Sequence, residues 1–336
     1  FGMAFNIDYS VCIILMAVLT AIYVIAGGYM ATAINDFIQG IIMLFGIATV
    51  IAAVLNSKGG FMAALDGLAK VSDPAVTDTP GIFASFFGPD PLNLLFVVIL
   101  TSLGTWGLPQ MVQKFYAIKD EKSIKKGTII STIFALVVAG GSYFLGGFGR
   151  LFSDEIDVAA NGYDSIIPTM LSGLSPMLIA LVVILVLSAS MSTLSSLVIA
   201  SSSTLTIDFL KDNFIKDMSD KKQVLSIRIL VVVFIAISSI LALIQYKSSI
   251  TFIAQLMGVS WGALAGSFLA PFMYSLYSKR VTKASCWVCF IFSSVLMIAN
   301  IFFRSSFPTI MQSPINCGAI AMLAGLVIVP VVSLFT

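Results

Sequence analysis

PMLIALVVILVLSASMSTLSSLVIASSSTLTIDF, residues 176–209, decides the class of fold. This segment is longer than the roughly 20 apolar residues that an α-helix needs to cross a bilayer, so it predicts a transmembrane helix that tilts or protrudes. The rest of the chain is similar, because 59% of its 336 residues are hydrophobic and only 10% are charged. A soluble domain of this size cannot bury so much apolar surface. We therefore predict an all-α polytopic membrane protein.

Comparable apolar segments recur along the chain. We expect about nine transmembrane helices, near residues 9–28, 36–56, 92–115, 127–149, 176–206, 223–246, 250–277, 284–303 and 315–335. Between the second and third lies a long loop, in which residues 61–71 are expected to form an amphipathic surface helix. Residues 163–171, in the loop 150–175, are expected to form another short helix at the interface.

Charge and composition bear on location and partners. Alternate loops place thirteen of the 18 Lys and Arg residues on one side, which the positive-inside rule assigns to the cytoplasm. We therefore expect a multi-pass plasma-membrane protein whose chain ends in the cytoplasm. A net charge of +2 gives no reason to expect nucleic acid, and a chain without His lacks the usual general base of an enzyme. Because the chain starts at Phe1, we expect it to be a piece of a longer protein.

Hydroxyl groups concentrate on the segment near residues 176–206. Ala189, Ser192 and Thr193 share one helix face, and Ser192, Ser195 and Ser196 repeat that spacing. Hydroxyl oxygens are neutral hard donors suited to an alkali cation that must be released again. The alternative is that these residues only permit close helix packing or bond back to their own carbonyls.

Asp36 is the acidic residue that lies deepest in apolar sequence. A carboxylate at a helix centre costs about 2.5 to 3.5 kcal/mol on insertion scales, so it needs a cation or a position near the interface. Asp36 with Gln39 also fits a capping box at a helix start, which requires no function. Ion binding and capping are both open at this point.

The segment TSLGTWGLPQMVQKF, residues 101–115, predicts a broken helix. Gly104, Gly107 and Pro109 oppose a continuous α-helix, and a broken helix at membrane depth usually lines a cavity. A kink near the interface is the alternative. We expect a solute site lined by Thr101, Thr105 and Trp106, with Gln255 from a later helix.

Three stretches of the chain resemble the sodium/solute symporter family, which includes proline, pantothenate, sialic acid and sugar transporters. YVIAGGYMATAINDFIQG, residues 23–40, resembles its GG-x-x-A…D-x-x-Q segment. GTWGLPQMVQKFYA, residues 104–117, resembles its G-x-P-x-x-x-x-R/K-F-x-A segment. SASMSTLSSLVIASSSTLTIDF, residues 188–209, resembles its most diagnostic helix.

The resemblance implies a LeuT-like fold of two inverted repeats. Residues 1–336 would form a single transporter domain, incomplete at its N-terminus, in which residues 1–56 end the first repeat, residues 92–277 form the second and residues 284–335 are peripheral helices. The absent first helices would include the broken one that completes the common sodium site.

Two sodium sites are implied by position. Ala189, Ser192 and Thr193 match the residues of the family's common site, whereas Asp36, Ser192, Ser195 and Ser196 match a second site found in some members. The chain departs from proline-transporting relatives, which place aromatic residues where Thr101 and Thr105 fall, and this argues against proline as the solute.

The implied activity is sodium-coupled symport of a small organic solute, such as an amino acid, vitamin or sugar, by alternating access. Na⁺ would be the coupling ion, the lipid bilayer the surroundings, and the transport unit a monomer. A substrate-gated channel or membrane sensor can share such a fold, and an enzyme is the third possibility.

Overall fold

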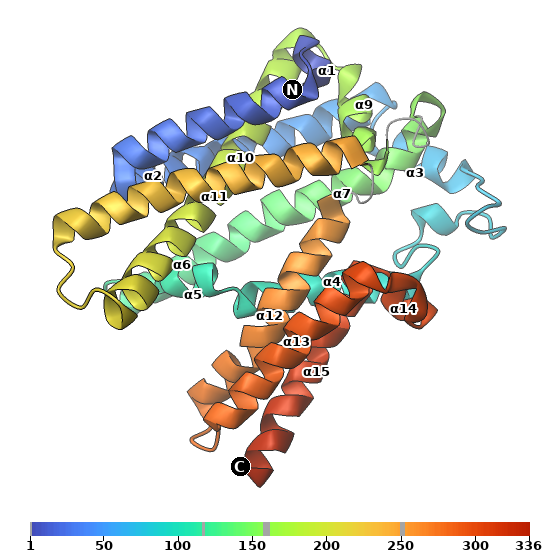
Figure 1. Cartoon of the computed structure of the whole chain (residues 1–336). Helices are drawn as coiled ribbons and strands as arrows, with labels where there is room; N and C mark the ends of the chain where they lie inside the picture. Colours follow the sequence, from blue (N-terminus) through green and yellow to red (C-terminus); the bar gives the residue numbers. More distant parts are fainter. Residues whose placement is uncertain (1, 116–117, 157–161, 249–252) are drawn as a thin grey trace. The chain divides into compact units, whose positions relative to one another are not determined.

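The computed structural model describes residues 2–115, 118–156, 162–248 and 253–336, and it is built from helices (Figure 1). An isolated bridge between Asp73 and Thr77 is the extent of β-structure among these residues. The predicted all-α class is therefore confirmed. The chain divides into two compact units, unit 1 with Phe1–Val71 and Asp120–Ile250, and unit 2 with Ser72–Lys119 and Thr251–Thr336.

Unit 1 contains the long helices α2, α10 and α11, and a further long helical segment that runs from α6 into α7. Its α-helices are α1 (Gly2–Phe5), α2 (Tyr9–Ser57), α3 (Phe61–Lys70), α6 (Glu121–Phe134), α7 (Gly140–Gly147), α9 (Ile166–Ser172), α10 (Pro176–Thr204) and α11 (Asp220–Ser248). Two π-helical segments continue α6 and α10, namely η2 (Ala135–Ala139) and η5 (Leu205–Lys211). The 3₁₀ segments are η3 (Phe148–Glu155) and η4 (Tyr163–Ser165).

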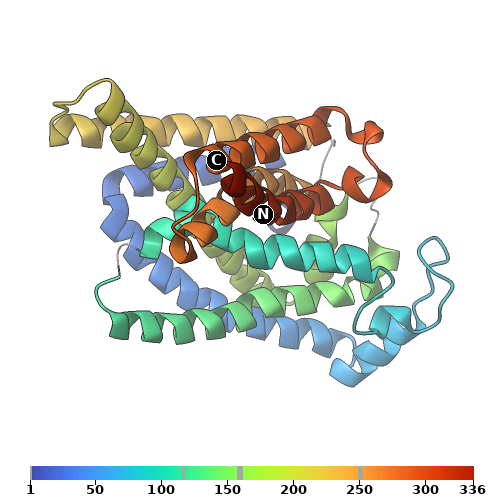
Figure 2. The ribbon, with the colours of Figure 1, turned by 90° about the horizontal axis from the view of Figure 1, so that it is seen from below.

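Helix α2 is two membrane-crossing helices joined at a kink. Gly28 has φ 60° and ψ −167°, a backbone conformation that only glycine adopts without strain. The chain reverses there, so residues 9–28 and 30–57 cross separately. The second half lies beside α6 and α7, where Gly40 faces Phe134 and Gly141 faces Ile47 (Figures 1 and 2).

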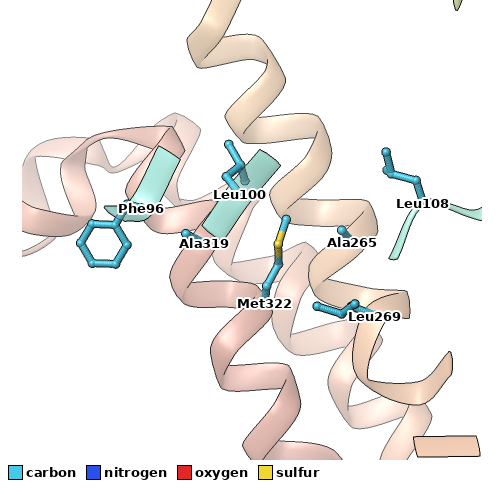
Figure 3. Close-up of a cluster of buried hydrophobic side chains, with 7 residues drawn as sticks. All are labelled: Phe96, Leu100, Leu108, Ala265, Leu269, Ala319 and Met322. Carbon is cyan, nitrogen blue, oxygen red and sulfur yellow. The ribbon is translucent and has the colours of Figure 1, made fainter. Parts of the chain in front are cut away.

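Unit 2 is built around α12 (Ile253–Tyr277) and α15 (Pro314–Phe335), its most extensively paired helices. The other elements are η1 (Ile82–Ala84), α4 (Pro91–Gly107), α5 (Pro109–Phe115), α13 (Lys283–Phe302), η6 (Arg304–Ser306) and α14 (Thr309–Gln312). Side chains from α4, α12 and α15, with Leu108, meet in a buried cluster drawn in Figure 3: Phe96, Leu100, Leu108, Ala265, Leu269, Ala319 and Met322.

Glycines allow the backbones of α12 and α15 to approach closely. A Cβ atom added to Gly262 would lie 2.6 Å from the Cα atom of Gly318, and one added to Gly258 would lie 2.7 Å from the backbone nitrogen of Ile315. Membrane helices associate through such small-residue contacts because lipid gives no hydrophobic drive between them. Unit 2 therefore depends on these glycines for its packing.

The predicted helices are found, with corrections at their ends. Eight helices among the described residues are long and apolar enough to cross a bilayer. The remaining expected segment, residues 92–115, is interrupted at the predicted break. There α4 ends at Gly107 and α5 starts at Pro109. The second helix begins at residue 30, not 36, because the turn is made by Gly28. The short helices expected at residues 61–71 and 163–171 are confirmed as α3 and as η4 with α9.

Candidate functional site

The predicted hydroxyl set forms a ladder along α10 in unit 1. Ser192 Oγ and Thr193 Oγ1 both donate to the carbonyl oxygen of Ala189, at 3.2 and 3.0 Å. Ser195 Oγ donates to the carbonyl oxygen of Ser192 and Ser196 Oγ to that of Thr193, each at 3.0 Å. The back-bonding alternative is thus present in the structure. It does not exclude ion binding, because a hydroxyl that donates its hydrogen keeps lone pairs that can face a cation.

Burial divides the ladder into two sides. Ser195 is fully buried, Ser192 and Ser196 are half-buried, and Thr193 is exposed in this chain. The buried side of α10 continues through Ser188 and Ser202, each seven residues from Ser195. A seven-residue spacing keeps side chains on one helix face. The hydroxyl ladder therefore lies at the edge of a buried polar stripe.

Helix α10, which carries this stripe, has its largest contact with α2. Near the kink of α2, Val24 packs with Val198, and further along Gly46 lies against Leu185. Asp36 and the hydroxyl ladder thus both lie in unit 1, on two helices that contact each other.

Asp36 does not start a helix. Non-helical dihedrals inside α2 occur at Gly28, and the second crossing is helical well before Asp36. The capping-box alternative is therefore wrong, because capping requires a non-helical residue at the first position. Asp36 is half-buried, and Gln39 lies one turn further with 7% of its surface exposed. The Gln39 Oε1 atom is buried without a hydrogen-bond partner.

Three polar side chains near the ladder were not predicted as site residues. Besides Gln39, the hydroxyls of Ser202 and Thr206 are fully buried without a hydrogen-bond partner. Buried polar atoms are nearly always satisfied, so such oxygens mark places where water or an ion belongs. The sequence signal was available, since Ser202 and Thr206 are four residues apart on one face of the helix.

The ladder and its neighbours offer hard oxygen donors with little formal charge. Hydroxyl and amide oxygens are neutral, and Asp36 supplies a carboxylate on the neighbouring helix α2. Such a set suits a monovalent hard cation better than a divalent one, which needs more charged ligands. The chemistry of the ladder's donors is therefore that of ligands for an alkali ion.

The predicted solute-site residues lie in unit 2, on and around the helix break. Leu108 separates α4 from α5 with an extended conformation, φ −87° and ψ 116°, which confirms the predicted interruption. Gly104 packs against Trp261, and a Cβ atom added to Gly107 would lie 2.8 Å from the Cα atom of Ala265. The glycines of the break therefore serve close approach to α12.

Three of these residues share the last turns of α4. Thr101 Oγ1 donates to the carbonyl oxygen of Val97 at 2.8 Å, and Thr105 Oγ1 to that of Ser102 at 3.0 Å. Both threonines are half-buried, while Trp106 is 59% exposed. An exposed indole beside a helix break can cover a small bound molecule.

Gln255 has a different environment, near the start of α12. The Nη1 atom of Arg304 donates to Gln255 Oε1 at 3.4 Å, and Arg304 Nε donates to the carbonyl oxygen of Gln312 at 2.6 Å. Arg304 therefore joins α12 to the connection between α13 and α15. Sequence reasoning missed this contact, which joins residues far apart in the chain.

Comparison with known proteins gives one family. The model of "Sodium:solute symporter family" matches residues 1–292. The osmoregulated proline transporter OpuE of Bacillus subtilis (strain 168) is 26% identical over 284 residues, 84% of this chain and 55% of that protein. A sodium/proline symporter of Staphylococcus aureus is 30% identical over 296 residues, 84% of this chain and 54% of that protein.

Other relatives differ in the solute that their names give. A sodium/pantothenate symporter of Haemophilus influenzae (strain ATCC 51907 / DSM 11121 / KW20 / Rd) is 30% identical over 215 residues, 62% of this chain and 41% of that protein. This chain spans about half the length of the curated relatives it matches. Among solved structures, a Na⁺-coupled sialic acid symporter in its substrate-bound outward-open state matches with a TM-score of 0.68. It is 19% identical, over 98% of this chain and 68% of that one. This likeness shows the LeuT-like fold.

Proposed function

Because this chain belongs to the sodium:solute symporter family, we propose that it is part of a secondary transporter in which sodium drives the uptake of a small organic solute by alternating access. The observation that carries the proposal is the hydroxyl ladder of α10, a helix in contact with α2, which carries Asp36. Both helices are long and apolar enough to cross a bilayer, where an ionised carboxylate such as that of Asp36 is costly unless it is paired.

Two sodium sites follow from the ladder. The first uses the Ala189 carbonyl, Ser192 and Thr193, and the second uses Asp36, Ser192, Ser195 and Ser196. These sets share Ser192, and the full burial of Ser195 supports the second set. The unpartnered Oε1 atom of Gln39, one turn from Asp36, is a further oxygen at the second site.

The number of ions decides how strongly the solute can be concentrated. At 100 mV one charge contributes about 2.3 kcal/mol, and a tenfold sodium gradient adds about 1.4 kcal/mol. One sodium ion therefore supports roughly 500-fold accumulation and two support on the order of 10⁵-fold. Two-ion coupling would explain why α10 presents more hydroxyls than one site requires.

The solute site is assigned to the helix break. Thr101 and Thr105 offer hydroxyls, Trp106 an aromatic face, and Gln255 an amide next to Arg304. The relatives' names give proline, pantothenate and sialic acid as solutes, and the two threonines favour one more polar than proline. We assign residues 1–56 to the end of the first repeat, 92–277 to the second and 284–335 to peripheral helices. From the Lys and Arg distribution we place the chain's last residues in the cytoplasm. We also propose that the transport unit is a monomer.

The decisive experiment is uptake by the full-length gene product in proteoliposomes. An inward sodium gradient should drive accumulation of one labelled solute from a panel of amino acids, vitamins and sugars above its outside concentration, and an equal potassium gradient should not. A channel only equilibrates the solute, and a sensor binds it without uptake. Either result would reject symport.

The first sodium site is tested by Thr193→Ala. This variant removes one neutral oxygen ligand, which contributes about 1 kcal/mol to the free energy of sodium binding. The sodium concentration for half-maximal uptake should therefore rise roughly fivefold. Thr128→Ala is the matched control, because Thr128 is also exposed and donates to the carbonyl four residues earlier, Ile124, at 2.9 Å. Equal sodium dependence of the two variants would remove Thr193 from the site.

A further inference from the structure

A groove of about 390 Å³ lies between α12 and α13 in unit 2. On α13 it is lined by Lys283, Cys286, Trp287 and Phe290, and on α12 by Phe268 and Pro271. The α13 residues follow the spacing i, i+3, i+4 and i+7, so they form one face of that helix. We call this feature the α12–α13 groove.

The walls of the groove are apolar. The rings of Phe268 and Phe290 meet edge to face with centroids 5.8 Å apart, and those of Trp287 and Phe290 do so at 5.9 Å. The hydroxyl of Ser267, which also borders the groove, donates to the carbonyl oxygen of Ala263 at 2.6 Å. Its one uncharged polar side chain is therefore satisfied within α12. The groove itself selects an apolar occupant.

One end of the groove is strongly basic. Lys283 lines it, and Lys279 and Arg280 precede it in the turn from α12 to α13. Residues 251–336 contain no Asp or Glu, so no carboxylate of this sequence region neutralises the three cations. Lys283 is also the first residue of α13, where the helix dipole disfavours a cation. An anion at this end would remove both penalties.

The groove faces away from the core of unit 2. Trp287 is 56% exposed, whereas Cys289 and Ser293, on the opposite face of α13, are fully buried. On a membrane helix, an exposed Trp one turn from a Lys is the arrangement found at the level of the lipid head groups. The basic end of the groove therefore fits the membrane surface, with Trp287 at the head-group boundary and Phe290, one turn further along α13, towards the acyl chains.

We propose that the α12–α13 groove binds an anionic phospholipid. One acyl chain lies against Phe268, Trp287 and Phe290, and the phosphate of the head group is held by Lys283 with Lys279 and Arg280. Basic pockets between membrane helices on the cytoplasmic side bind anionic head groups in this way. The Lys and Arg distribution assigns this turn to the cytoplasmic leaflet, where anionic lipids are concentrated.

Quenching of Trp287 by brominated lipid tests the proposal. The full-length protein is placed in phosphatidylcholine vesicles with increasing fractions of dibrominated phosphatidylglycerol or dibrominated phosphatidylcholine. Subtracting the Trp287→Phe variant isolates the signal of this indole. Phosphatidylglycerol should quench Trp287 at a lower mole fraction than phosphatidylcholine. Lys283→Gln should weaken that preference roughly fivefold, the effect of one cation near the surface.

Matched variants separate charge from folding. Lys125→Gln removes an exposed lysine of α6 and should leave the preference intact, and Lys283→Arg should retain it. Equal quenching by the two brominated lipids, or an unchanged preference in Lys283→Gln, would overturn the proposal. So would absence of quenching together with a Cys286 cross-link between two copies, because a second chain would then cover the groove.

Discussion

The substitution Gly262→Ala should destabilise the protein by separating α12 from α15. The added Cβ atom would lie 2.6 Å from the Cα atom of Gly318 and 2.8 Å from the sulfur of Met297, whereas ordinary contact begins at 3.4 Å. The Met297 side chain can move, but the Gly318 backbone cannot without shifting a helix. Relief therefore requires about 0.8 Å of helix separation, and overpacking of this kind costs about 1–3 kcal/mol.

Gly127→Ala is the matched control for this prediction. Gly127 lies in α6, is exposed, and an added Cβ atom there meets nothing within 4 Å. Alanine has a higher helix propensity than glycine, so this variant should gain up to about 1 kcal/mol. The same substitution should thus change stability in opposite directions at the two sites, with a difference of about 1–4 kcal/mol.

The measurement is thermal unfolding of the full-length protein in detergent. Unfolding is monitored as the fraction of protein that still elutes from a size-exclusion column as a single species after heating. A loss of 1 kcal/mol lowers the midpoint by roughly 2–4 °C. Gly262→Ala should therefore unfold several degrees below the parent and Gly127→Ala at or above it. Equal midpoints for the two variants would refute the argument that the glycines of α12 serve close packing.

Three further predictions concern individual side chains. Asp36→Asn combined with Ser196→Ala should lower the Hill coefficient for sodium from near two to near one while uptake persists; an unchanged coefficient would exclude the second site. The Asp120 carboxylate accepts the N–H of Ser123 at 2.7 Å, which lowers its pKa below the usual 3.8. The hydrogen bond therefore stabilises the fold above pH 3.8, and this stabilisation is lost as the pH falls through the lowered pKa. In acid unfolding, the free energies of unfolding of Asp120→Ala and the parent should differ at neutral pH and converge in strong acid. Arg304→Met should lower the thermal midpoint by more than Gln255→Met does. Both variants lose the Arg304–Gln255 hydrogen bond, but only Arg304→Met also loses the 2.6 Å hydrogen bond to the carbonyl oxygen of Gln312.

The membrane helices could be predicted from sequence because the bilayer imposes a length and an apolar composition on each of them. The break near residue 108 was also predictable, since Pro109 and its neighbouring glycines act on local backbone geometry. The start of the second helix was not, because Asp36 and Gln39 imitate a capping pattern while the turn is made by Gly28.

The site was predictable in part. The shared face of Ser192, Ser195 and Ser196 follows from helical spacing alone, but burial of Ser195 with exposure of Thr193 depends on where α2 packs. The contact of Gln255 with Arg304 joins residues 49 positions apart and has no local signal. The π-helical continuation of α10 over Leu205–Lys211 likewise follows from packing.

The back-bonded hydroxyls of α10 bear on how quickly ions would exchange at the proposed sodium sites. Each of the four already directs its hydrogen to a carbonyl of the preceding turn, so its oxygen is aimed before an ion arrives. At the proposed sodium sites, no hydroxyl rotamer would then have to change and no proton would have to leave when sodium binds or is released. A preorganised site loses little conformational entropy when the ion binds, and neutral ligands bind the ion weakly. Occupancy should therefore follow the sodium concentration quickly and be insensitive to pH near neutrality.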